Sequence, residues 1–357
     1  METHKDIDSL FCLRKEKNLG FCMNISLSQE RILSNSDRLE FVDIAKGLGI
    51  ILVVCSHTVY PQLMYFANLF FIPLFFVLSG YTLHTLSLKK KAIRLLKPYF
   101  LFNIAIALMM YVSRLKDVSL NHLVGIIYSR FALYPLETGG ENHIFMNIGN
   151  SPTWFLTCMF IAFVLLYFIL QAKKYRYWVL ASYVGLTVAF NELPILLPWS
   201  IDVAFLMAVF MYGGMLLREK GWMNLSVVYV IVFCLAYIAL SYLTGYCNLS
   251  VRNYGNSILL FLIGGIIGSY LIIRLAQLLE KTFLKKVLVA IGQHSLVIFC
   301  IQIPILFVIQ KLCSRFMLYL PEDVQLLGLS FMQIIFTLSI GYAISRFINR
   351  FMPVVVK

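Results

Sequence analysis

Long runs without a charged residue limit the folds open to this sequence of 357 residues. Residues 47–88 contain no Asp, Glu, Lys or Arg, and five further runs share this property: 151–172, 221–251, 253–273, 287–310 and 324–345. Each run can supply the roughly 20 residues with which a helix crosses a bilayer. A soluble domain needs charge over its surface, and the strands of a porin-type barrel alternate polar and apolar residues. The pattern predicts a polytopic membrane protein and excludes a soluble enzyme, a disordered chain and a porin.

Ten membrane spans account for the apolar runs. We place them at 44–60, 66–88, 98–113, 153–171, 177–190, 200–217, 222–243, 257–279, 287–310 and 326–348. The predicted fold class is therefore all-α, a membrane helix bundle of about ten transmembrane helices. The positive-inside rule places both termini in the cytoplasm. All 30 Lys and Arg residues then fall on the cytoplasmic side except Arg114, Lys116, Arg130, Arg252, Lys311 and Arg315.

The formal net charge of +13 could suggest a nucleic-acid partner. Because the basic residues gather in the N-terminal segment and the cytoplasmic loops, the charge indicates topology, and we expect no nucleic-acid partner. Residues 1–36 are polar and predict a disordered cytoplasmic tail, whereas 37–357 form one integral-membrane domain. The bilayer is the partner that the composition requires. The cysteines show no metal-ligand spacing, and we expect no metal.

Three ionisable residues lie in or beside the first span: Asp43, Lys46 and His57. At 100° per residue, Lys46 and His57 are about 20° apart around a helix, and Asp43 is about 40° from His57. All three therefore share one face. A cation at the cytoplasmic edge and a deeper imidazole suit a molecule with an anionic head and a reactive end that enters the membrane. Ionisable residues inside a membrane are expensive and generally functional.

Each of these residues also has a simple structural explanation. A lysine at a cytoplasmic helix end commonly extends its ammonium to the water interface, and a deep histidine can be a hydrogen-bonded packing residue. The shared face, with no other charge between Lys46 and His57, favours the functional interpretation.

These residues and several motifs resemble the integral-membrane acyltransferase 3 family, in its branch of fucose 4-O-acetylase-like acetyltransferases. Lys46 and His57, separated by ten residues, resemble the Arg/Lys-X10-His motif of its first span. Further matches follow in order: Pro73-Leu-Phe-Phe-Val-Leu-Ser79-Gly80-Tyr81, Arg94-Leu-Leu-Lys97-Pro98, Pro152-Thr-Trp154-Phe-Leu, Pro198-Trp-Ser-Ile-Asp202 with Gly213 and Gly214, and Gly292-Gln-His-Ser295-Leu. The resemblance covers about residues 37–350.

The resemblance implies transfer of an acetyl group from acetyl-CoA to a hydroxyl of a surface or lipid-linked carbohydrate, at a bacterial cytoplasmic membrane. A sugar hydroxyl needs a base that titrates near neutral pH, which is the usual work of histidine. His57 can act as that base or carry the acetyl group itself. Asp202 is the candidate to orient the imidazole, although an ordinary solvated acid at a helix end fits it as well.

The phosphates of acetyl-CoA need cations on the cytoplasmic side. Lys46, Arg94 and Lys97 are the candidates, while the positive-inside rule and anionic lipid also favour basic residues there. The second-span residues Ser79, Gly80 and Tyr81 can admit either a neighbouring helix or the pantetheine arm.

Trp154 and Gln302 complete the candidate site. Trp154 fits an interfacial anchor or a sugar-stacking residue. The resemblance is imperfect at Phe71 and Gln302, because each stands where many members of the branch have histidine. His57 is then the only membrane-deep histidine left for the chemistry.

The main alternative is a polysaccharide or small-molecule transporter or flippase, which also places charge inside the membrane. Such folds often contain paired broken helices in two related halves, and no such pair is visible. A purely structural membrane partner would not explain the shared face of Asp43, Lys46 and His57.

Overall fold

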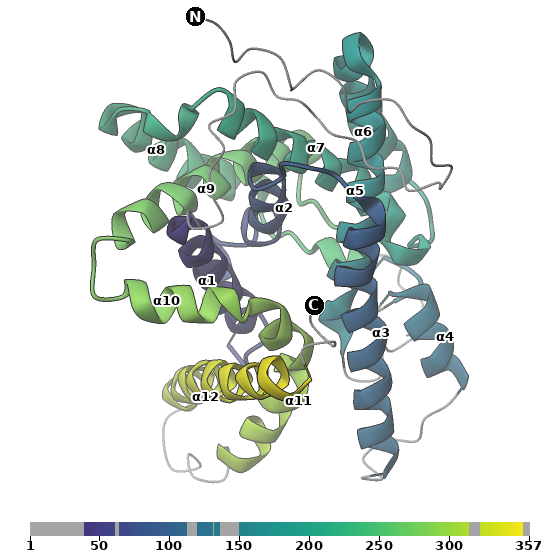
Figure 1. Ribbon diagram of the computed structural model, residues 1–357, viewed down its shortest axis with the longest axis vertical. Coiled ribbons are helices and arrows are strands. Elements are labelled where there is room, and N and C mark those ends of the chain that lie inside the picture. The colour runs from purple at the N-terminus through teal and green to yellow at the C-terminus, as the bar shows by residue number, and fades with distance from the viewer. Residues whose placement is uncertain are drawn as a thin grey trace, which may run out of the picture.

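The computed structural model describes residues 39–60, 64–112, 120–130, 132–135, 150–313 and 322–352 (Figure 1). The predicted tail, 1–36, lies outside these residues. Within the described ranges every named element is a helix, and Asn248 and Asn253 form an isolated β-bridge. Seven of the helices in the described ranges are long and apolar enough to cross a membrane. The predicted all-α membrane bundle is confirmed.

Twelve α-helices are named in the described part of the chain. They are α1 Glu40–Cys55, α2 Phe71–Tyr81, α3 Leu88–Val112, α4 Leu120–Tyr128, α5 Trp154–Gln171, α6 Arg176–Asn191, α7 Ile201–Glu219, α8 Val227–Thr244, α9 Ile258–Leu279, α10 Lys285–Gln293, α11 Ser295–Cys313 and α12 Glu322–Phe351. Short 3-10 turns precede α5, α6 and α7. Each of the ten predicted spans overlaps at least one of these α-helices.

The helices depart from the predicted spans at four places, one of them α3, which begins at Leu88, ten residues before the predicted span. The first span was expected to continue to residue 60, but α1 ends at Cys55, where the hydroxyls of Ser56 and Thr58 donate back to backbone carbonyls. The second span shortens to α2, with turns before Phe71. The ninth span divides into α10 and α11. Side-chain competition for the last carbonyls of α1 gives a physical reason for its early end.

Hydrogen bonds join helix ends that the predicted topology places on the same side of the membrane. At the expected cytoplasmic end, Glu280 Oε1 accepts the backbone N–H of Phe41 at 2.7 Å. At the opposite end, the backbone N–H groups of Val59 and Tyr60 donate to Gln333 Oε1 and Ser330 Oγ, both at 3.1 Å. We call these the inner and outer ends of the bundle.

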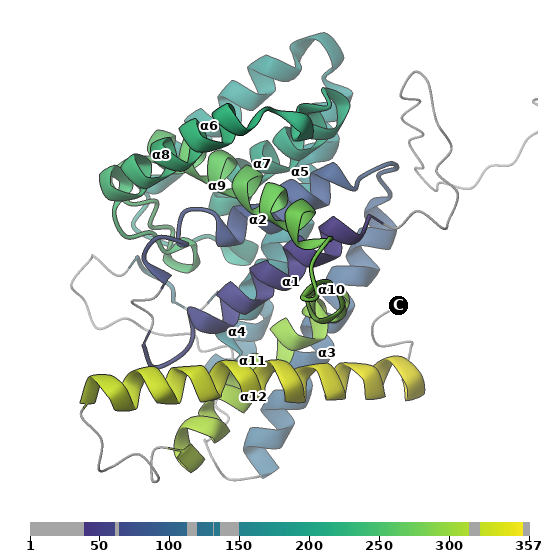
Figure 2. The same cartoon turned by 90° about the vertical axis from the view of Figure 1, so that its left-hand side faces the viewer.

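Two helices lie at the middle of the bundle. α1 contacts α2, α9, α10, α11 and α12, and α7 contacts α2, α5, α6 and α9. By contrast, α8 lies at the rim in both views (Figure 2). Only 11% of its apolar 18-residue segment is buried inside the protein. Its exposed side chains include Val228, Ile231, Val232 and Leu235. The lipid of a bilayer is the environment that suits this apolar rim.

Glycines bring the central helices into backbone contact. A Cβ at Gly80 of α2 would overlap the Met211 carbonyl of α7, and one at Gly214 of α7 would overlap the Val77 carbonyl of α2. On α10, a Cβ at Gly292 would overlap the carbonyl oxygen of Asp43. Small residues are the usual means by which membrane helices approach this closely.

We therefore expect Gly80→Ala to destabilise the protein by about 1–3 kcal/mol, because α2 and α7 must separate to admit the methyl group. Thermal unfolding of detergent-solubilised protein measures this change. Gly213→Ala on α7 is the matched control, since a Cβ there meets no atom within 4 Å. Equal melting temperatures for the two variants would contradict this account of the α2–α7 contact.

Candidate active site

One face of α1 carries the polar residues identified in the sequence. Asp43, Lys46, Ile50 and Val53 follow one another at helical spacing of three and four residues and line a cavity toward the inner end. His57 comes four residues after Val53, just beyond the end of α1, and lines a second cavity toward the outer end. The shared face of the three ionisable residues is present in the structure, with each end of it in a different cavity.

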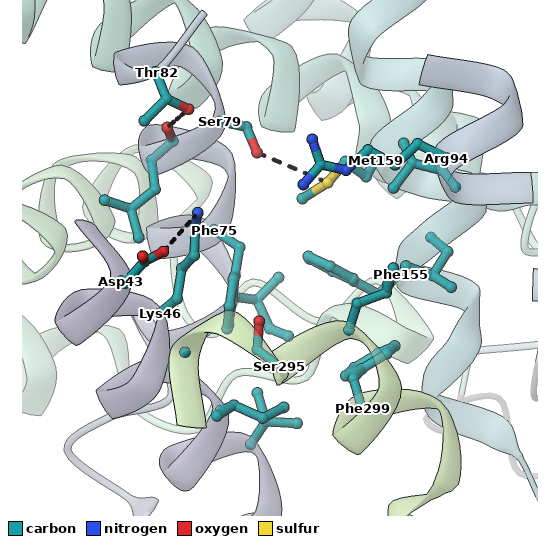
Figure 3. Close-up of a pocket in the computed structure, with 18 of the residues that line it drawn as sticks. Asp43, Lys46, Phe75, Ser79, Thr82, Arg94, Phe155, Met159, Ser295 and Phe299 are labelled. Atoms are coloured by element: carbon teal, nitrogen blue, oxygen red, sulfur yellow. Dashed lines mark hydrogen bonds and ion pairs between the residues drawn. The ribbon is translucent and has the colours of Figure 1, made fainter. Parts of the chain in front are cut away.

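The inner cavity has a volume of about 250 Å³ and lies between α1, α2, α3, α5, α10 and α11. Three cations line it: Lys46, Lys91 and Arg94. Figure 3 shows Lys46 and Arg94 entering it from different helices, with Phe75 and Phe155 on its walls. Its lining therefore combines a cationic part with an apolar part.

Several polar contacts fix the positions of side chains that line this cavity. The Lys46 ammonium lies 3.6 Å from the carboxylate of Asp43, which is almost fully buried. Gln293 Nε2 also donates to Asp43, at 3.4 Å. The Lys91 ammonium lies 4.1 Å from the centroid of the Phe163 ring, an energetically favourable cation–π arrangement. Ser79 turns its hydroxyl to the sulfur of Met159 at 3.8 Å (Figure 3).

The outer cavity has a volume of about 170 Å³. It is lined by the aromatic rings of Phe71, Trp154, Phe155, Tyr246 and Phe299, by the polar residues Ser56, Asn68, Asn248 and Ser250, and by His57 with several apolar neighbours. Among the described residues that line it, none is Asp, Glu, Lys or Arg. Trp154 is buried and faces this cavity, so it is not a lipid-exposed anchor.

The early end of α1 sets the orientation of His57. The backbone N–H of His57 donates to the carbonyl of Val54 at 3.1 Å, so the carbonyl of Val53 is open to side chains, and the Ser56 hydroxyl donates to it at 2.8 Å. His57 Nδ1 lies 2.9 Å from that carbonyl oxygen and 2.9 Å from Ser56 Oγ. Because a carbonyl oxygen only accepts, Nδ1 carries the proton, and Nε2 of the neutral ring keeps its lone pair.

The two cavities meet at a common wall. Val53, Ile72, Phe155 and Phe299 line both of them. These four residues come from α1, α2, α5 and α11. A cationic cavity at the inner end and a histidine cavity at the outer end are therefore separated by one layer of apolar side chains.

The structure does not bring Asp202 to His57. Asp202 lies in the first turn of α7, fully buried, and its two carboxylate oxygens bind the equally buried guanidinium groups of Arg130 and Arg252. Arg130 Nη1 also donates to the carbonyl of Ser250 at 3.0 Å. Since Ser250 lines the outer cavity, this ionic cluster holds part of the cavity wall. The backbone carbonyl of Val53 takes the orienting position that the sequence suggested for Asp202.

The other predicted residues are distributed around the cavities. Lys97 lies half-buried on α3, outside the inner cavity's lining. Gly80 packs against α7, and the Tyr81 carbonyl accepts from Arg218 Nη1 at 2.9 Å. Gln302 is fully buried on α11, and among the described residues its side-chain amide has no hydrogen-bond partner.

Sequence reasoning passed over several residues that the structure places at or beside the site. Lys91 stands in the cytoplasmic basic run beside Arg94, so the helical spacing of three residues could have marked it. Arg130 and Arg252 were exceptions to the positive-inside rule, and that departure was the available signal for a buried partner such as Asp202.

Replacement of Asp202 by Asn removes the charge that balances two buried guanidinium groups. We expect Asp202→Asn to destabilise the folded protein by about 3–5 kcal/mol, the usual effect of breaking a buried ion pair from one side. Size-exclusion profiles and thermal unfolding after solubilisation measure it, with Glu219→Gln at the exposed end of α7 as control. A variant with normal stability and a selective loss of activity would instead support a role at the imidazole.

Comparison with known proteins identifies a family for this chain. A family model described as an acyltransferase domain, that of the acyltransferase 3 family, matches residues 39–346, from the start of α1 into α12. No curated protein and no solved structure matches the chain. The match includes all the helices that form the two cavities and their common wall. The chain therefore belongs to the acyltransferase 3 family and is an integral-membrane acyltransferase.

Proposed function

We propose that this protein transfers an acetyl group from cytosolic acetyl-CoA to a hydroxyl of a cell-surface or lipid-linked carbohydrate, as the fucose 4-O-acetylase-like branch of the family does. One observation carries the proposal: a cationic inner cavity and an outer cavity containing His57 share a single apolar wall. Because acetyl-CoA is made in the cytosol, the inner end faces the cytoplasm, and we assign the protein to the bacterial cytoplasmic membrane.

The inner cavity suits both the phosphate end and the thioester end of acetyl-CoA. Lys46, Lys91 and Arg94 supply positive charge for the phosphates, and the planar guanidinium of Arg94 can bind a phosphate through two N–H groups. Beyond them the lining becomes apolar at Leu78 and Phe75, where the pantetheine arm and its thioester can lie. The donor then points its reactive end at the wall in front of His57.

The chemistry at His57 follows from its ring orientation. Nε2 removes the proton of the acceptor hydroxyl as the hydroxyl oxygen forms an ester bond to the acyl carbon. The carbon–sulfur bond of the thioester breaks, and the CoA thiolate leaves and takes up a proton. The Val53 carbonyl stabilises the imidazolium that forms, through its hydrogen bond with Nδ1.

A two-step route uses the same atoms. Nε2 attacks the thioester to form an acyl-imidazole with release of CoA, and the acceptor hydroxyl then takes the acyl group and gives up its proton. In this route the acyl group passes through the wall and is bound to His57 before the acceptor reacts. Both routes require Nε2 to be unprotonated.

The outer cavity suits a carbohydrate acceptor. Sugars present hydroxyl groups and apolar C–H faces, which match the amides of Asn68 and Asn248 and the aromatic rings of Trp154 and Tyr246. The absence of acidic and basic side chains among the described residues of this lining suits an uncharged acceptor. The Arg130–Asp202–Arg252 cluster fixes the loop that carries Asn248 and Ser250.

We expect His57→Ala to lower transfer by at least about 100-fold, the usual contribution of a general base. Mass spectrometry of envelope glycans from cells carrying the variant in place of the natural protein measures O-acetyl content, and immunoblotting of membranes checks protein level. His84→Ala is the matched control, because this exposed histidine lines neither cavity. Unchanged acetylation in His57→Ala would remove His57 from the chemistry, and loss of glycan export instead of acetylation would favour a transporter.

The donor site has its own test. Lys46→Ala combined with Arg94→Ala removes two charge-assisted contacts, and we expect acetyl-CoA affinity to fall by at least about tenfold. Calorimetric titration of protein in nanodiscs measures the dissociation constant. Lys89→Ala with Lys90→Ala removes the same charge from exposed positions of α3 outside the inner cavity's lining. Equal losses of affinity in the two double variants would contradict a specific phosphate site.

A further inference from the structure

The wall between the cavities consists of four apolar side chains from four helices. Phe155 and Phe299 form its aromatic part, with ring centroids 5.3 Å apart and ring planes inclined at 58°. Val53 and Ile72 complete it. Figure 3 shows the two rings close together at the edge of the inner cavity. Since all four residues line both cavities, the direct path of the acyl group from the inner to the outer cavity passes through this layer.

We propose that Val53, Ile72, Phe155 and Phe299 form a gate that limits the acyl group to one of acetyl size, an inference that rests on the proposed function. The apolar wall also shields the thioester from water in the outer cavity, which slows its hydrolysis from that side in the absence of an acceptor. The imidazole lies directly behind the gate, because its Nδ1 is bonded to the carbonyl of Val53.

The two rings of the gate are held very differently. Phe155 makes edge-to-face contacts with Phe75 and Phe76, at centroid distances of 5.7 and 5.2 Å. Its neighbours in the chain are also fixed: Thr153 Oγ1 accepts from Asn103 Nδ2 at 3.1 Å, and Thr157 Oγ1 lies 2.8 Å from the Ser129 hydroxyl. Phe155 is therefore the fixed side of the gate.

Phe299 belongs to a segment whose hydrogen bonding within its own helix is interrupted. α11 begins at Ser295, directly after the break at His294, and Pro304 removes the N–H that would bond the Cys300 carbonyl. Gln302, one turn beyond Phe299, buries both polar atoms of its amide without a partner among the described residues. A buried unpaired amide is destabilising. Movement of Phe299 with this turn of α11 therefore opens the gate at lower cost than movement of Phe155.

A gate of this kind predicts selection by acyl length. In an apolar pocket that rejects larger groups, one additional methylene changes the rate by about 10–200-fold. Butyryl-CoA differs from acetyl-CoA by two methylenes in the acyl group alone, so its phosphates and pantetheine arm bind equally well. Truncation of Phe299 to Ala enlarges the gate and leaves the cations of the inner cavity unchanged.

The test measures incorporation of radiolabelled acetyl and butyryl groups from the two CoA esters into base-labile, non-protein material of washed membranes, which contain the natural acceptor. We expect Phe299→Ala to raise the butyryl-to-acetyl ratio by at least about tenfold over the natural protein. Leu296→Ala is the matched control, because Leu296 lies on the same helix and lines the inner cavity only. Phe299→Trp adds the opposite change and should lower the acetyl rate without weakening acetyl-CoA binding.

The outcomes separate the gate from the proposed function. A natural protein that incorporates no acetyl group at all refutes the proposed function. If acetyl groups are incorporated but the butyryl-to-acetyl ratio is the same in the natural protein, Phe299→Ala and Leu296→Ala, the gate is refuted. The proposed function is not affected by that result. Phe299→Leu replaces Phe299→Ala where the alanine variant does not fold, and the same ratio decides. A Phe299→Trp variant that loses acetyl-CoA affinity in step with its rate also counts against the gate.

Discussion

The hydrogen bond from His57 Nδ1 to the Val53 carbonyl is the contact on which the rest of the site depends. In a regular helix the backbone N–H of His57 would occupy that carbonyl. Because α1 tightens after Cys55 and this N–H bonds to Val54 instead, the Val53 carbonyl is left for the ring and for the Ser56 hydroxyl, which also donates to it. One contact thereby sets the tautomer, directs the lone pair to Nε2 and places the imidazole against a residue of the wall between the cavities.

The same helix connects the two halves of the proposed reaction. Its inner part presents Lys46 to the donor cavity, and its last turn presents Val53 to both cavities. Helix α1 is fixed at its inner end, where Gly292 of α10 lies against the Asp43 carbonyl and Glu280 accepts the Phe41 N–H. A displacement of α1 would therefore alter the cation, the gate and the imidazole together, which gives these distant residues a common structural basis.

The sequence predicted the parts that follow from charge and helical period. Charge-free runs predicted the bundle, and the spacing of Asp43, Lys46 and His57 predicted one face that the structure contains. Pairing of Asp202 with Arg130 and Arg252 was not predicted, because these residues come from three segments that are distant in sequence. The gate was also missed, since Phe155 and Phe299 are apolar residues in apolar spans and carry no distinguishing pattern. Only the packing of four helices marks them.

The sidedness of the reaction tests the central claim that donor and acceptor occupy cavities on opposite sides of one wall. Sealed membrane vesicles of each orientation receive radiolabelled acetyl-CoA, which does not cross the bilayer, and acetyl transfer to endogenous acceptor is measured. The account predicts labelling in inverted vesicles, whose outer surface exposes the inner end of the bundle, and labelling in right-side-out vesicles only after permeabilisation. Labelling of sealed right-side-out vesicles at the same rate as inverted ones would contradict it.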